Sequence, residues 1–173
     1  GDYYISRIKA YHNFESISSD ITYLRPPEHI KSLDITSINS ESKALNMAYI
    51  SGIIADFLND KKLLPTVSGR MSSEGFVFQA AVEDKKATIS PVVQVENSQI
   101  EIDAAYEGIN SLALMEAKRD LAENFLIRQL YYPFRTWQRK MGDKPVRPIF
   151  LIILIVFFIY MNIDLMIYNT ITL

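Results

Sequence analysis

The chain has 173 residues, nearly half of them hydrophobic, and a formal net charge of −2. This length suits one domain or a domain with a small appendage, and the charge does not exclude a local basic patch for nucleic acid. The sequence has no cysteine and only two histidines, His12 and His29, which excludes disulfides and thiolate zinc sites and argues against a multi-histidine metal centre. The lack of cysteine fits a reducing cytoplasm. The chain begins with Gly1 and shows no signal peptide, which is compatible with a fragment of a longer protein.

The first half of the chain predicts one long helix over residues 40–58. Residues 1–20 show no clear periodicity, and Pro26 and Pro27 break the chain. Within 40–58, apolar residues recur every three or four positions. Ser40 or Ser42 can cap the start, and the polar run 59–62 ends the helix.

Residues 63–78 predict two short strands around a Ser/Gly-rich turn. A helix followed by a hairpin is the layout of a winged helix, in which Lys61, Lys62 and Arg70 would contact DNA phosphates. The alternative is a helix packed on the first hairpin of a larger sheet, with these cations facing solvent. Further strands are expected at 76–82 and 87–95, separated by the charged turn 83–86, and Pro91 indicates an edge or a bulge.

Residues 99–118 predict a β-hairpin with acidic side chains on one face. The apolar side chains of the first strand take the even positions from Ile100 to Tyr106, so Glu101 and Asp103 point to the opposite face. In the second strand Glu116 and Lys118 share a face, and the run 108–111 supplies the turn.

The register of this hairpin decides whether the acidic residues meet. If the turn is centred between Ile109 and Asn110, Asp103 lies opposite Glu116, and Glu101 lies opposite Lys118. Two such carboxylates repel unless a cation joins them, and Mg²⁺ suits these ligands. The metal can polarise a phosphoryl oxygen, while Lys118 orients or deprotonates water or neutralises the phosphate. The alternative is an ordinary hairpin with ion pairs on a solvated face.

A second helix is predicted over residues 120–132, capped by Asp120 and ended or kinked by Pro133. Its expected buried side leaves Arg128, Gln129, Tyr132 and Arg135 to face DNA phosphates or the active site, or simply solvent. Trp137 is expected to pack in the core. A basic linker follows, formed by Arg139, Lys140, Lys144 and Arg147.

These residues resemble a known pattern. Asp103, then Glu116-Ala-Lys118, then a helix with Gln129 resembles the PD-(D/E)XK nuclease superfamily and, more narrowly, a bacterial family like type II restriction enzymes. The resemblance implies that Asp103 and Glu116 bind the metal, that Lys118 assists catalysis, and that Gln129 supports them. It implies an α+β (α/β) fold with a restriction-endonuclease-like mixed β-sheet flanked by helices. Ile102 stands where the pattern has proline.

The resemblance covers residues 40–150 and divides the chain into three parts. We expect a helical or winged-helix-like region at 1–78, a nuclease core at 79–151 and a hydrophobic tail at 152–173. The resemblance calls for a strand at 146–151, whereas the uncharged run 149–161 also allows a membrane helix, which needs about 20 apolar residues. A non-native end is a third possibility.

The leading hypothesis is a Mg²⁺-dependent, type II restriction-like endonuclease that hydrolyses double-stranded DNA in the cytoplasm. In this hypothesis Glu101 and Gln129 support the metal ligands and Lys118. Cutting both strands requires two active sites and hence a homodimer on DNA. The alternatives are a non-enzymatic winged-helix DNA-binding protein and a small protein anchored in the membrane by its tail.

Overall fold

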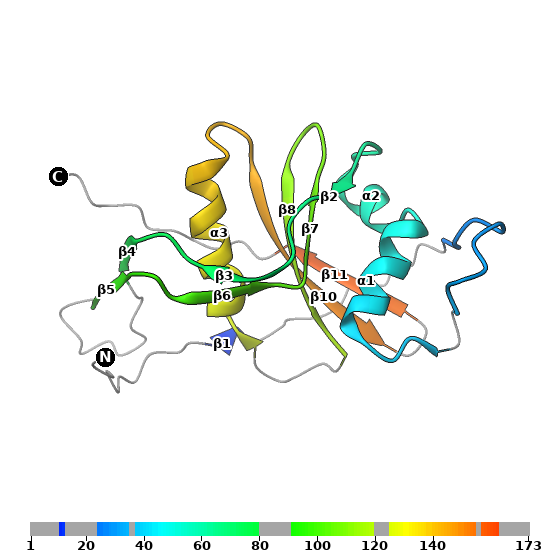
Figure 1. Ribbon diagram of the computed structural model, residues 1–173, viewed down its shortest axis with the longest axis horizontal. Helices are drawn as coiled ribbons and strands as arrows, with labels where there is room; N and C mark the ends of the chain where they lie inside the picture. The colour runs from blue at the N-terminus through cyan, green and yellow to red at the C-terminus, as the bar shows by residue number, and fades with distance from the viewer. Residues whose placement is uncertain are drawn as a thin grey trace.

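A mixed five-stranded sheet with helices on both faces forms the centre of the protein (Figure 1). The computed structural model describes residues 11–12, 24–34, 37–79, 91–119, 125–154 and 157–162. The sheet order is β11–β10–β8–β7–β2, in which only β8 and β10 run parallel. The strands are β2 (Leu64–Pro65), β7 (Ala104–Glu107), β8 (Leu112–Lys118), β10 (Val146–Leu154) and β11 (Phe157–Asn162). The predicted α+β class with a mixed sheet is therefore confirmed.

Two short helices cover one face of the sheet. They are α1 (Glu41–Ile50) and α2 (Ile53–Leu58), in place of the single helix predicted over 40–58. The break falls at Gly52, whose φ of 76° lies in the left-handed region that favours glycine. The Ser40 side chain accepts a hydrogen bond from Lys43 N at 3.2 Å and caps α1, as predicted. Both helices pack with β7, β8 and β10 in one apolar cluster.

Helix α3 (Arg128–Lys140) covers the opposite face and joins the parallel strands β8 and β10. The helix predicted over 120–132 is wrong at both ends, because β9 (Phe125–Leu126) comes first and the helix continues through Pro133. Proline near a helix start removes a single i→i−4 bond, here the one to the Gln129 carbonyl. The predicted cap, Asp120, lies outside the described residues. Trp137 is buried, as predicted.

A two-stranded ribbon leaves the sheet beneath α3 (Figure 1). It contains β3 (Gly69–Ser72) paired with β6 (Gln99–Ile102), and β4 (Phe76–Gln79) paired with β5 (Val92–Val95). The hairpin predicted within 63–78 is therefore wrong: its segments pair with later strands in the run 92–107 instead of with each other. Without that hairpin the described residues form no wing. The charged turn predicted at 83–86 lies outside the described residues.

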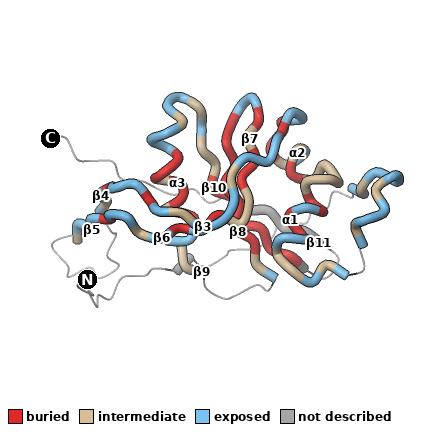
Figure 2. Tube along the Cα trace, in the orientation of Figure 1, coloured by how far each residue is buried: buried red, intermediate tan, exposed pale blue. Residues whose placement is uncertain are grey.

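The apolar run near the C-terminus forms strands. β10 includes the predicted strand at 146–151 and extends it to Leu154, and Ile149 and Leu151 are fully buried. β11 pairs with it antiparallel. In the part of the chain that the structure describes, no helix is long and apolar enough to cross a membrane. Buried positions concentrate on the central strands and on the helix faces that touch them, and the ribbon is largely exposed (Figure 2).

Strand β1 (Tyr11–His12) pairs with β9. Irregular or short elements are expected for residues 1–20, and apart from Tyr11 and His12 these residues lie outside the described ranges.

Candidate active site

The hairpin β7–β8 has the predicted register. Ala104 pairs with Met115 and Tyr106 with Ala113, and the next pair in this series is Asp103 with Glu116. The ladder stops at Asp103, where a bend separates β6 from β7. The Asp103 side chain spans this gap, because its Oδ2 accepts a hydrogen bond from Ala117 N at 2.8 Å.

The bend at Asp103 also changes which side chains share a face. Ile100 and Ile102 of β6 pack in the cluster under α3, whereas Ala104 and Tyr106 of β7 pack in the cluster under α1. The single apolar face predicted from Ile100 to Tyr106 is therefore wrong beyond Asp103. A bend of this kind behaves like a bulge, which redirects the side chains that follow it.

Glu116 is buried at the centre of the site, with 3% of its surface exposed. Its Oε1 accepts hydrogen bonds from Gln129 Nε2 at 2.8 Å and from Lys118 Nζ at 2.7 Å. Burial, followed by the charge of Asp103, raises the pKa of Glu116 to about 7, although Lys118 acts in the opposite direction. Asp103, Glu116, Lys118 and Gln129 thus come together from a bend, one strand and a helix.

Lys118 lies between two carboxylates. Its Nζ is 2.7 Å from Glu116 Oε1 and 3.7 Å from Glu41 Oε1, and it also donates to Ala117 O at 3.1 Å. Partial burial acts to lower the pKa of Lys118, but the hydrogen bond and charge of Glu116, together with Glu41 and Asp103, outweigh burial and raise it. Lys118 is therefore an ammonium ion at neutral pH.

The predicted pairing of Glu101 with Lys118 is wrong. Because β6 leaves the hairpin at Asp103 and pairs with β3, Glu101 lies opposite Arg70 and accepts a hydrogen bond from its Nε at 3.1 Å. Both side chains are more than half exposed.

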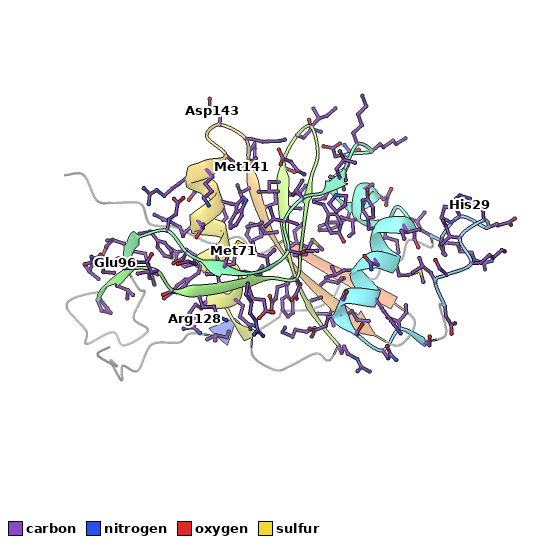
Figure 3. The ribbon with its side chains drawn as sticks, viewed as in Figure 1. His29, Met71, Glu96, Arg128, Met141 and Asp143 are labelled. Carbon is purple, nitrogen blue, oxygen red and sulfur yellow. The ribbon has the colours of Figure 1, made fainter. Side chains whose placement is uncertain are left out.

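These side chains line one pocket of about 330 Å³ between the start of α1, the strands β6 and β8, and the start of α3. All four predicted catalytic residues line it. Of the predicted DNA-binding residues, Arg128 lines it as well, at the end of α3 that lies beside β6 (Figure 3). Lys61, Lys62 and Arg70 do not. The full lining is Glu41, Gln99, Ile100, Glu101, Asp103, Glu116, Lys118, Arg128, Gln129, Tyr132 and Pro133.

Sequence reasoning missed Glu41, whereas it placed Tyr132 with Gln129 among the residues that could face DNA or the active site. Glu41 belongs to an acidic-x-Lys triplet like that of Glu116, but no local spacing connects the start of α1 with the end of β8. Tyr132 lies three residues after Gln129, on the same side of a helix.

The donor set fits a magnesium ion. Within the described ranges, no group of three or more His, Cys, Asp or Glu side chains is arranged to hold a metal ion. Mg²⁺ needs fewer, because it keeps several waters and is usually bound through one or two carboxylates. Asp103 and Glu116 supply two carboxylates on one pocket wall, and burial followed by the charge of Asp103 raises the pKa of Glu116.

The fold and site define an α+β domain with an acidic pocket at the base of a β-hairpin. The chain belongs to a family described as a domain of unknown function, DUF6997, whose model matches residues 6–173. No curated protein and no solved structure matches the chain.

Proposed function

We propose that the protein is a Mg²⁺-dependent, type II restriction-like endonuclease that hydrolyses phosphodiester bonds in double-stranded DNA. The observation that carries this proposal is the meeting of Asp103 and Glu116 on one pocket, with Lys118 and Gln129 both bonded to Glu116. The resemblance to the PD-(D/E)XK superfamily rests on the same four residues.

Each of these residues has a separate task. Asp103 and Glu116 would hold the metal, which supplies Lewis-acid polarisation of the phosphate and activation of a water molecule. Ala117 N fixes the Asp103 carboxylate, and Gln129 fixes that of Glu116. Because Lys118 is an ammonium ion, it orients the water or compensates charge on the phosphate by donating hydrogen bonds.

The charge of the pocket explains why a metal is required. Carboxylates of Glu41, Asp103 and Glu116 surround the single ammonium of Lys118. A phosphate group would meet net negative charge here and would be repelled. A divalent cation held by Asp103 and Glu116 would neutralise this charge, so we expect cleavage to depend strictly on added metal.

Incubation of the purified protein with unmethylated plasmid or phage DNA tests the proposal. Discrete fragments should appear with Mg²⁺ and not with a chelator. Lys118→Ala should remove cleavage and leave DNA binding largely intact. Lys140→Ala is the matched control, because Lys140 is half-exposed at the far end of α3 and pairs with Glu74 outside the pocket. Unchanged cutting by Lys118→Ala, or no metal-dependent product from the wild type, would remove the proposal.

Cutting both strands requires a second active site. We expect a homodimer on DNA, and sedimentation of the protein with and without a short duplex measures this directly. A monomer that cuts both strands at one position would contradict the expectation.

A further inference from the structure

Arg128 differs from the other cations near the pocket. Lys118 is held by Glu116 and Glu41, and Arg70 is held by Glu101. Among the described residues, no carboxylate lies within ion-pair distance of Arg128, which is exposed and lines the pocket at the first position of α3. A second cation that no acidic residue of these ranges neutralises thus faces the space into which a substrate would enter.

Tyr132 holds this cation in place. The central guanidinium carbon of Arg128 lies 5.7 Å from the centre of the Tyr132 ring, at the distance of a cation–π contact. Tyr132 is itself packed edge-on against Phe76 of β4, with ring centres 5.2 Å apart and an interplanar angle of 84°. In the described residues no hydrogen bond engages the guanidinium of Arg128, so its N–H donors are available to an acceptor.

An arginine arranged in this way suits a phosphate group. The planar fork of N–H donors matches two phosphate oxygens, and a guanidinium already held by a ring loses less freedom on binding. The metal and Lys118 compensate the phosphate that is cut, but the nucleic-acid backbone carries a further charge on each neighbouring nucleotide. On the α3 side of the pocket, Arg128 is placed for one of these.

We infer that Arg128, held by Tyr132, forms a subsite for a phosphate of the DNA strand next to the phosphate that is cut. This inference rests on the proposed function and assigns one substrate contact to α3. It makes Arg128 a binding residue, whose loss weakens DNA binding even where cleavage cannot occur, and Tyr132 a positioning residue that acts through Arg128.

Salt-dependent DNA binding tests the subsite. The probe is a short fluorescein-labelled duplex, measured by anisotropy across a NaCl series with Ca²⁺ in place of Mg²⁺. Arg128→Ala should lower affinity about tenfold at low salt, as for one lost charge-assisted contact. It should also reduce the slope of log affinity against log salt by about one. Lys140→Ala is the matched control and should keep the slope, because Lys140 pairs with Glu74 outside the pocket.

Two variants of Tyr132 separate positioning from mere packing. Tyr132→Phe keeps the ring and should bind like the wild type, whereas Tyr132→Leu should weaken binding by a smaller factor than Arg128→Ala with the slope retained. If the wild type binds and cuts DNA, and Arg128→Ala has the same affinity and the same salt slope as the wild type, the subsite is overturned and the proposed function is not. A wild type that binds no DNA would overturn the subsite and the proposed function together.

Discussion

Replacing Glu116 with glutamine is expected to stabilise the metal-free protein at mildly alkaline pH. The pKa of Glu116 is raised from 4.5 to about 7 in the folded chain, first by burial and then by Asp103. Between these two pH values the folded state binds more protons than the unfolded state, so the free energy of unfolding falls as pH rises. Above pH 7 the full cost of ionising Glu116 is present.

The structure sets the size of this effect. One pKa unit corresponds to about 1.4 kcal/mol, so ionised Glu116 costs about 3 kcal/mol of unfolding free energy. Glutamine keeps the acceptor for Gln129 but removes the nearest charge that Lys118 contacts, which leaves Lys118 with the Glu41 carboxylate at 3.7 Å and the Ala117 carbonyl at 3.1 Å. We therefore expect a net gain of about 2 kcal/mol, or a rise in Tm of about 4–8 °C for a chain of this size.

Urea unfolding in the presence of a chelator measures the gain at two pH values. At about pH 8 Glu116→Gln should be the more stable protein, and at about pH 5, where the wild-type carboxyl is protonated, the two should agree closely. Glu74→Gln is the control, because Glu74 is half-exposed and pairs with Lys140, and its effect should be small at both pH values. A variant that is less stable at about pH 8, or equally stabilised at both, would show that Glu116 is not strained by its charge.

Two further predictions concern the metal and the hairpin turn. Mg²⁺ should raise the Tm of the wild type by binding only the folded chain, and Asp103→Asn should lose most of this rise in a thermal scan; an equal rise would contradict the proposed ligand set. Gly108→Ala should destabilise the fold by about 1–3 kcal/mol in urea, because a Cβ there would collide with the Asp60 carboxylate, which accepts a hydrogen bond from Asn110 N in the turn. Gly75→Ala, whose Cβ would meet its nearest atom at 3.7 Å, is the control and should change stability little.

Local patterns predicted the part of the site that local forces determine. The Gly and Asn residues of the turn and the alternation along Leu112–Lys118 predicted the register that opposes Asp103 to Glu116, and the structure has this register. Register is strongly specified where one residue of slippage would move every side chain to the other face. Gln129 came from the resemblance, and the structure bonds it to Glu116.

The features of the fold and site that the sequence did not reveal depend on contacts between segments far apart in the chain. Apolar and polar residues alternate from Ile100 to Tyr106 as they would in a single strand. β6 nevertheless pairs with the distant β3, and the apolar side chains change to the other face of the sheet at Asp103. Asp120 and Pro133 are ordinary start and stop signals for a helix, but α3 starts at Arg128 and tolerates Pro133 early in its length. The contact of Glu41 with Lys118 joins segments with no local relation.

The environment of Glu116 argues against an ordinary ion pair as the reason for this cluster. On a solvated face, a lysine at 2.7 Å would hold the pKa of a glutamate below its usual value, as an opposite charge at short range does. Here burial, and after it the charge of Asp103, raises the pKa of Glu116 in spite of Lys118. A chain that needed only stability at this position would place an apolar residue or glutamine there. A buried carboxylate beside a second one is understandable if a divalent cation occupies the pocket during function. The Glu116→Gln measurement tests whether the charge of Glu116 destabilises the metal-free protein, and the Mg²⁺ measurement tests whether a metal binds there.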